Sequence, residues 1–494
     1  MEEKPKTYIK VYPINPPNAY VGIYVDPLTK QYRYEVLEPK LFPKEMKIFN
    51  RIKEILYEEL DIEATNLKRE EMEKYLEEKI KEIIKKYKIR ITEETIAKIM
   101  YYVKRDFTGY SKIDVPMRDS NIEDITCDGA GTPIYVWHRE YESMPTNIIF
   151  ETPEELDSFV IRLAYKAGKH VSVSQPIVDG ALPDGSRVQV TFGKEVSLKG
   201  SSFTIRKFKR DPLTIVDLIK NHTLSTEMAA FFWFIIENRA SILISGGVAA
   251  GKTTLLNALA IFIPPEFKII SIEETPEINL PHENWLQLVT RPSFGARETN
   301  ITLFDLLKAA VRQRPDYLIV GEIRGEEAYT LFQAISTGHL SLSTMHADSV
   351  ESVIRRLESE PMNIPRKLIT AMDIITIQGR LTIANHPARR TLTVTEITGL
   401  GRNNEILTNE IYHWNQNDDV FEYKGRAYIL ERIIRRTTYT YESIQRELER
   451  RQRVLQWMAE RNIRYYKEVS RIIREYRLNP DVVYRRATLQ RGRE

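Results

Sequence analysis

The sequence predicts a protein of the α/β class, in which a parallel-sheet domain follows an α+β region and precedes a basic helical C-terminal region. Apolar runs of strand length alternate with helical spacings from about residue 213 to 400, as in a parallel sheet covered by helices. Residues 110–206 mix short strands with a helix, and residues 440–478 indicate two basic helices. The 494 residues exceed one hydrophobic core, so we expect about two to four domains.

The elements can be placed in chain order. Short alternating strands occupy residues 7–37, and a helical pattern dense in Glu and Lys runs from Pro43 to about Lys104. A strand at Pro133–His138 and a helix near Pro153–Ala167 follow. The predicted domains are a small β-meander with a charged helical region (1–104), an α+β domain (105–206), a linker (207–212), a parallel-sheet core ending in a β-meander (213–424) and a basic helical region (425–494).

Composition restricts the cellular location of the protein and the kinds of site that it can carry. The lone cysteine, Cys127, excludes an internal disulfide and a cysteine-cluster metal site. The sequence begins Met-Glu-Glu-Lys and has no run of 18 apolar residues, so we expect a cytoplasmic protein without a signal peptide or membrane span. The overall net charge is +3, but residues 424–494 hold 19 Lys and Arg against 9 Asp and Glu.

A glycine-rich loop follows the apolar run of residues 241–245 and has the spacing G-x-x-x-x-G-K-[ST]. Such a loop turns backbone N–H groups toward a phosphate, and the helix after it directs its positive dipole end at the same anion. We expect Lys252 at the β- and γ-phosphates and the Thr253 hydroxyl on Mg²⁺. The loop predicts a nucleoside triphosphate site, with ATP and Mg²⁺ bound at Gly246, Gly247, Val248, Ala249, Ala250, Gly251, Lys252, Thr253 and Thr254.

Polar side chains follow several other predicted strands of this domain. Glu273 and Glu274 come after residues 268–272, Glu322 after residues 317–320, and His346 after residues 340–343. Ligands of a parallel sheet collect at the carboxyl ends of its strands, which is the edge that carries the phosphate loop. Asp316 instead opens its strand, about 20 Å from that edge, and is expected to be structural.

The chemistry of phosphoryl transfer suggests a role for each of these groups. Thr253 and Glu322 would hold Mg²⁺, directly or through water. Either Glu273 or Glu274 would orient the attacking water, and His346 would hydrogen-bond the γ-phosphate. The sequence of this domain offers no cationic finger for the transition state, whereas Arg187 and Arg206 in the preceding domain are candidates.

Four motifs in this order resemble those of the type II/type IV secretion ATPase superfamily. They correspond to its Walker A loop, acidic box, Walker B segment and His box, and they span residues 246–254, 272–277, 314–324 and 337–347. The segment from Asn121 to Arg139 and the tail motifs at 460–464 and 472–476 look like the archaeal branch, which drives pili, the archaellum or protein secretion. The resemblance covers about residues 105–480.

This resemblance implies a RecA-like P-loop ATPase domain joined to an N-terminal domain, working as a homohexamer. Arg187 and Arg206 occupy the places of family arginines that reach the nucleotide. The implied partners are a polytopic membrane platform protein and, indirectly, pilin-like subunits, with the ATPase at the inner face of the cell membrane. Many bacterial assembly ATPases carry a tetracysteine zinc site, which a chain with Cys127 alone lacks, and this favours the archaeal branch.

The leading interpretation is an ATPase that assembles a type IV pilus-like filament or archaellum, or drives type II-like secretion. The alternatives are a conjugation-type ATPase that translocates nucleic acid, and a pilus retraction motor. No nucleic acid partner is expected, because the sequence shows no aromatic-interleaved basic loops. The amphipathic basic helices of the C-terminus would pack on their own domain, an anionic membrane surface or acidic loops of the platform protein.

Overall fold

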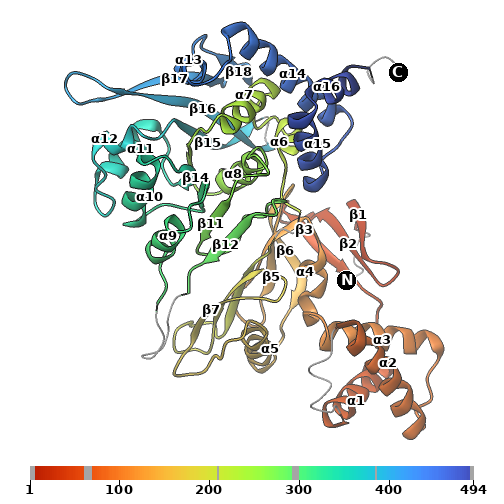
Figure 1. The fold of residues 1–494 in the computed structure, drawn as a ribbon. Coiled ribbons are helices and arrows are strands. Elements are labelled where there is room, and N and C mark those ends of the chain that lie inside the picture. Colours follow the sequence, from red (N-terminus) through yellow and green to blue (C-terminus); the bar gives the residue numbers. More distant parts are fainter. Residues whose placement is uncertain (1–5, 60–68, 209–210, 292–299, 384–385, 490–494) are drawn as a thin grey trace. The chain divides into compact units, whose positions relative to one another are not determined.

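The computed structural model describes residues 6–59, 69–208, 211–291, 300–383 and 386–489. The chain divides into two compact units, Met1–Phe208 and Lys209–Glu494, drawn in red to yellow-green and in green to blue in Figure 1. The finer boundaries predicted from the sequence stay predictions, and parts of the predicted linker and of both termini lie outside the described residues.

The first unit is built on one sheet. Within its described residues the strand order is β1-β2-β3-β6-β5-β4-β9-β8-β7, and neighbours are antiparallel except β3 and β6, which run parallel. The strands are β1 (Tyr8–Asn15), β2 (Ala19–Val25), β3 (Tyr32–Leu37), β4 (Ile122–Cys127), β5 (Pro133–His138), β6 (Glu142–Ile149), β7 (Ile177–Ala181), β8 (Arg187–Thr191) and β9 (Ser202–Arg206). The sequence predicted β5 to the residue, and β1 to β3 lie within residues 7–37, where short strands were predicted.

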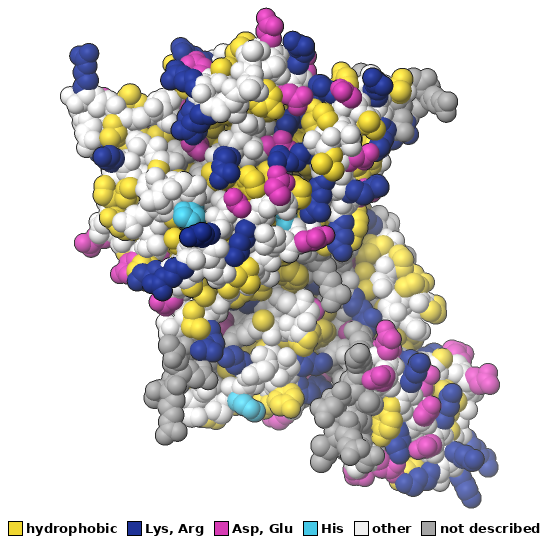
Figure 2. Space-filling model, in the orientation of Figure 1, with side chains coloured by type: hydrophobic (Ala, Val, Ile, Leu, Met, Phe, Trp, Pro, Cys, Tyr) yellow, Lys and Arg dark blue, Asp and Glu magenta, His cyan; other side chains and the backbone are white. Residues whose placement is uncertain are grey.

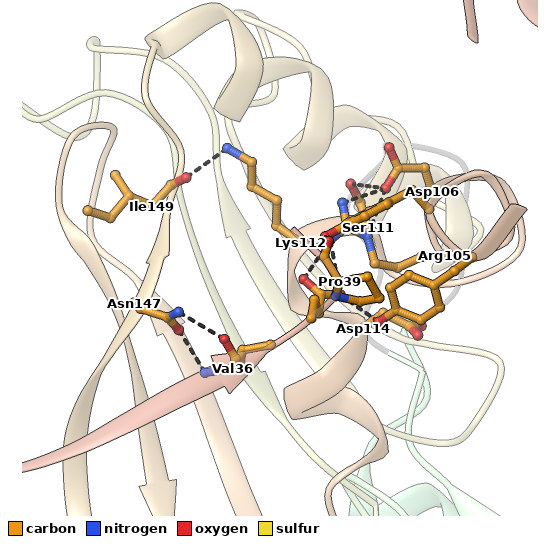
Figure 3. Close-up of polar contacts among 12 residues, drawn as sticks. Val36, Pro39, Arg105, Asp106, Ser111, Lys112, Asp114, Asn147 and Ile149 are labelled. Carbon is orange, nitrogen blue, oxygen red and sulfur yellow. Dashed lines mark hydrogen bonds and ion pairs between the residues drawn. The ribbon is translucent and has the colours of Figure 1, made fainter. Parts of the chain in front are cut away.

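Side chains join the N-terminal strands to the rest of this sheet. The Val36 N–H donates to Asn147 Oδ1 at 2.8 Å, and Asn147 Nδ2 donates to the Val36 carbonyl at 3.0 Å, so one amide continues the short β3–β6 ladder (Figure 3). The hydroxyls of Tyr12 and Tyr34 both donate to Asp119 Oδ2, at 2.7 and 2.9 Å. The β-meander is thus continuous with the α+β region that follows it.

The helices of the first unit have two roles. Three of them, α1 (Pro43–Glu59), α2 (Arg69–Lys86) and α3 (Glu93–Phe107), pack on one another around a core of their own that includes Ile52, Leu56 and Ile80. The short η2 (Ser111–Ile113) and α4 (Asp114–Arg118) connect them to the sheet, and α5 (Pro153–Lys166) packs its apolar side on β8 and β9. The charged helical region predicted from the sequence is therefore a small bundle.

The second unit contains a mixed sheet. In its described residues the order is β12-β11-β13-β14-β10-β15-β16-β17-β18, parallel from β12 to β15 and antiparallel from β15 to β18. The strands are β10 (Ile242–Gly246), β11 (Ile269–Glu273), β12 (Trp285–Val289), β13 (Tyr317–Val320), β14 (Leu340–Met345), β15 (Ile374–Ile383), β16 (His386–Leu400), β17 (Ile406–Asn415) and β18 (Val420–Tyr423). This is the parallel α/β architecture with a terminal meander that the sequence predicts.

Helices pack on this sheet, and four more helices follow its last strand to the C-terminus. They are α6 (Ile215–Lys220), α7 (Thr226–Glu237), α8 (Lys252–Ala260), α9 (Leu303–Val311), α10 (Glu327–Ser336), α11 (Val350–Glu358), α12 (Arg366–Ile369), α13 (Tyr428–Arg436), α14 (Tyr441–Glu460), α15 (Tyr466–Leu478) and α16 (Pro480–Leu489). Two of the four C-terminal helices, α14 and α15, were predicted as basic helices. None of the helices in the described part of the chain is long and apolar enough to cross a membrane.

The C-terminal helices share the core of the second unit. Apolar residues of α13 to α16 pack in one cluster with α7 and β10, and Arg451 of α14 is only 4% exposed. Its guanidinium lies 4.9 Å from the ring centre of Trp233 and 2.7 Å from the carboxylate of Glu237. The apolar faces of these helices thus pack on their own domain. On the face drawn in Figure 2, basic, acidic and hydrophobic side chains are intermixed.

Candidate nucleotide site

The phosphate loop leaves the sheet between two strands. β10 pairs with β14 on one side and β15 on the other, and it ends at Gly246. A Cβ on Gly246 would lie 2.3 Å from the Gln378 carbonyl of β15, so this position requires glycine. Gly251 has a φ of 88° and is the N-cap of α8, which begins at Lys252 as the motif predicts. The local geometry is that of an anion-binding loop at a helix N-terminus.

The Lys252 side chain lies inside this loop. The residue is 8% exposed, and its Nζ donates to the carbonyls of Gly246 and Gly247 at 3.1 and 2.9 Å. The same Nζ lies 3.1 Å from Nδ1 of His346. Burial lowers the pKa of the Lys252 ammonium, because the charged form is deprived of water.

His346 bridges Lys252 and Glu322. Its Nε2 lies 3.4 Å from Glu322 Oε1, while its Nδ1 faces the ammonium, so we assign the proton to Nε2. Burial, and then the charge of Lys252, lower the pKa of His346 and favour the neutral ring. Three of the residues predicted from separate motifs therefore meet at one edge of the sheet.

The two acidic-box glutamates have different surroundings. Glu273 is 2% exposed, and its Oε1 accepts the N–H groups of Glu277 and Ile278 at 2.7 and 2.9 Å. Its Oε2 accepts from Gln287 Nε2 at 2.8 Å. Burial raises the pKa of Glu273 to about 7 despite these donors. The Glu273 carboxyl group thus fixes the backbone of the segment that follows β11, through Glu277 and Ile278.

Glu274 instead projects from the strand end. Its side chain is 42% exposed and forms an ion pair with Arg324, which follows β13. Of the two glutamates that the sequence left as alternatives, Glu274 is the one with an accessible carboxylate.

Asp316 lies at the opposite edge. It precedes β13, and its Oδ2 accepts the Lys268 N–H at 2.9 Å. A carboxylate there fastens the starts of β11 and β13 together, which is the structural role expected from the direction of the strand.

Arg187 and Arg206 lie side by side in the first unit. They are paired across β8 and β9, and both line a concavity of about 380 Å³ with Asp124 and Asp179. Arg206 Nε lies 3.5 Å from Asp124 Oδ1. Two cations directly opposite one another on a sheet repel, and the Asp124 carboxylate offsets part of this repulsion. Their action on a nucleotide stays a prediction.

The metal prediction depends on the nucleotide. No group of three or more His, Cys, Asp or Glu side chains in the described residues is arranged to hold a metal ion. Mg²⁺ commonly binds through one or two protein oxygens plus substrate phosphates. Thr253 and Glu322 stay the predicted protein ligands of such a shared site, which would form with the triphosphate.

Sequence reasoning missed one cation beside the loop. Arg389 of β16 donates from Nε to the Ala249 carbonyl at 3.1 Å. The expectation that this domain offers no cationic finger for the transition state stays a prediction, but an arginine does lie beside its phosphate loop. No local pattern marked this arginine, because its place depends on the pairing of β15 with β10 and of β16 with β15, which was not predicted.

The sheet order and the loop are those of a P-loop protein. Residues 113–475 match the family described as Type II/IV secretion system protein. The match covers well over half of the chain, and the chain belongs to this family. The resemblance stated from the four motifs is confirmed.

Some relatives match this chain beyond the residues 113–475 that the family model covers. Protein MJ0900 of Methanocaldococcus jannaschii is 39% identical over 490 residues, which cover 94% of this chain and 88% of that protein. A probable conjugal transfer protein, TrbB, of Sinorhizobium fredii is 31% identical over 248 residues, covering 49% of this chain and 73% of TrbB. Among solved structures, the VirB11 ATPase from the Brucella suis type IV secretion system is 23% identical with a TM-score of 0.30, covering 56% of this chain and 89% of that one.

Proposed function

We propose that this chain is an ATPase that couples Mg-ATP hydrolysis to the assembly of a type IV pilus-like filament or archaellum, or to type II-like secretion. The observation that carries the proposal is the contact series Lys252–His346–Glu322 at the mouth of a phosphate loop. These groups come from three motifs and would surround the terminal phosphates. The family membership supplies the link to secretion and pilus machinery.

Each residue has a role in the proposed hydrolysis. Lys252 would neutralise the β- and γ-phosphates, and Thr253 with Glu322 would hold Mg²⁺. Glu274 would orient the attacking water, because its carboxylate is accessible and Glu273 is committed to the loop backbone. His346 would respond to the γ-phosphate, since that anion would compete for the Lys252 ammonium that His346 contacts.

The assembly is proposed from the family. The chain would form a homohexamer in the cytoplasm at the inner face of an archaeal cell membrane, working on a polytopic platform protein and indirectly on pilin-like subunits. Arg187 and Arg206 would act on the nucleotide of a neighbouring subunit.

A second candidate function is nucleic-acid translocation, which the similarity to a probable conjugal transfer protein favours. Filter binding with duplex and single-stranded DNA at several salt concentrations separates the two functions. Binding that weakens steeply with salt would support translocation. If the protein acts in filament assembly or secretion, we expect it to retain no DNA on the filter at physiological salt.

A pair of matched variants tests the chemistry. Glu322→Gln should abolish most ATP hydrolysis while leaving ATP binding, because it removes charge and keeps shape. Asp316→Asn, at the other end of the same strand, should hydrolyse ATP at close to the wild-type rate if it folds. A more damaging effect of Asp316→Asn on turnover than of Glu322→Gln would contradict the site.

Mixed rings test the arginines. Arg206→Ala subunits and Lys252→Ala subunits are each expected to be inactive alone. Mixing them should restore measurable hydrolysis, since a ring then contains an intact loop beside an intact arginine. Mixed rings that stay inactive would show that Arg206 does not act across subunits.

A further inference from the structure

Arg389 lies against the outer side of the phosphate loop. Besides its hydrogen bond to the Ala249 carbonyl, its Cδ is 3.3 Å from the position of a Cβ on Gly251. In the part of the chain that the structure describes, Arg389 has no carboxylate partner. Its charge and its planar guanidinium are therefore available to a ligand held by the loop.

The neighbouring residue holds Arg389 in this position. Arg390 is 6% exposed, and its Nε and Nη2 each donate to a different carboxylate oxygen of Asp419 at 2.8 Å. The Thr391 N–H donates to the Thr223 carbonyl at 2.7 Å. Because successive strand residues face opposite sides, burial of Arg390 directs Arg389 away from the packed side.

The order of the sheet shows which end of a nucleotide Arg389 faces. Glu322 and His346 follow β13 and β14, on one side of β10, and Lys252 contacts His346 there. Arg389 belongs to β16, on the other side of β10. A triphosphate whose γ-phosphate meets Glu322 and His346 has its nucleoside end directed away from them, toward β15 and β16.

We propose that Arg389 contacts the base and ribose of the bound nucleotide and fixes its nucleoside end. This inference rests on the proposed ATPase function. A guanidinium stacks on aromatic faces while its N–H groups donate to nearby oxygens, and a lysine ammonium lacks that plane. Arg389 would be a positioning residue that acts on nucleotide affinity and not on the chemical step.

The test measures binding of three probes to the full-length protein by calorimetry: Mg-ADP, the Mg complex of a non-hydrolysable ATP analogue, and Mg-tripolyphosphate, which has no nucleoside. For Arg389→Ala we expect a dissociation constant about tenfold higher for both nucleotides, the effect of one good contact. Tripolyphosphate should bind as to wild type, and the KM for ATP should rise by a larger factor than kcat falls. Arg389→Lys should recover little of the loss.

Two control variants distinguish failure of the proposed Arg389 contact from failure of the nucleotide site as a whole. Arg402→Ala removes an exposed arginine from the turn between β16 and β17 and should leave all three affinities unchanged. Lys252→Ala should weaken all three probes, and wild-type protein that binds none of them would refute the nucleotide site itself. The nucleoside contact is refuted by either of two results, provided that Lys252→Ala weakens binding of all three probes. In the first, Arg389→Ala binds both nucleotides as tightly as wild type. In the second, Arg389→Ala loses as much affinity for tripolyphosphate as for the nucleotides.

Discussion

The buried carboxyl group of Glu273 should make the stability of the second unit depend on pH. Its pKa is raised from 4.5 to about 7 in the folded protein because burial penalises the charged form. Because the pKa of Glu273 is higher in the folded than in the unfolded protein, the protonated carboxyl group favours the folded state. This contribution is complete below pH 4.5 and is lost as the pH rises through about 7. The shift corresponds to at most about 3 kcal/mol.

Glu273→Gln isolates this effect. Its amide oxygen can still accept the N–H groups of Glu277 and Ile278, and a rotated Gln287 amide can accept from its NH₂ group. We therefore expect wild type and variant to be about equally stable near pH 4.5. By pH 8 the variant should be more stable by up to about 3 kcal/mol, because it carries no buried charge.

Hydrogen exchange provides the assay, since it reports the opening free energy of β11 separately from that of the first unit. Exchange rates of amides in Ile269–Glu273, corrected for intrinsic chemistry, would be compared between pH 5 and 8. Glu274→Gln, whose side chain is 42% exposed, is the control and should show no such trend. A constant difference between wild type and Glu273→Gln across this range would refute the raised pKa.

Two further predictions concern the frame around the sites. Asn147→Ala should destabilise the attachment of β3 by about 1–3 kcal/mol, because both polar groups of Val36 lose their partner; faster exchange of the Val36 amide would show it, and an unchanged rate would contradict it. Asp419, whose pKa is lowered to about 2 mainly by hydrogen bonds from Arg390, stabilises the fold above pH 3.8, and this contribution is lost as the pH falls through about 2. Acid unfolding of Asp419→Asn should therefore be less steep than that of wild type, and identical acid limbs would count against the ion pair.

Much of the site was predictable because its residues lie in local patterns. The phosphate loop, the start of its helix and the strand Tyr317–Val320 were predicted to the residue or nearly so. The carboxyl-end rule for parallel strands then brought Glu322 and His346 to one edge, although 24 positions of sequence separate them. Periodicity and strand direction were sufficient for this part.

Contacts between distant segments were not predictable in the same way. Arg389 reaches the loop only because β15 pairs with β10, which is more than 100 positions earlier in the chain. Glu273 and Glu274 differ by one residue at a strand end, and sequence patterns do not resolve which of the two is buried. Likewise, the basic excess of the C-terminus did not reveal that Arg477 and Arg432 form ion pairs with Glu266 and Asp373 earlier in the second unit.

The burial of Arg451 links the C-terminal helices mechanically to the nucleotide loop. Its partner Glu237 is the last residue of α7, and β10, which delivers the chain to the loop, begins at Ile242. Separating α14 from α7 would break the Arg451–Glu237 ion pair and expose the apolar cluster that the two helices share. Because that separation is costly, we expect a load on the outer surface of α14 to pass through α7 to the strand that carries the phosphate loop.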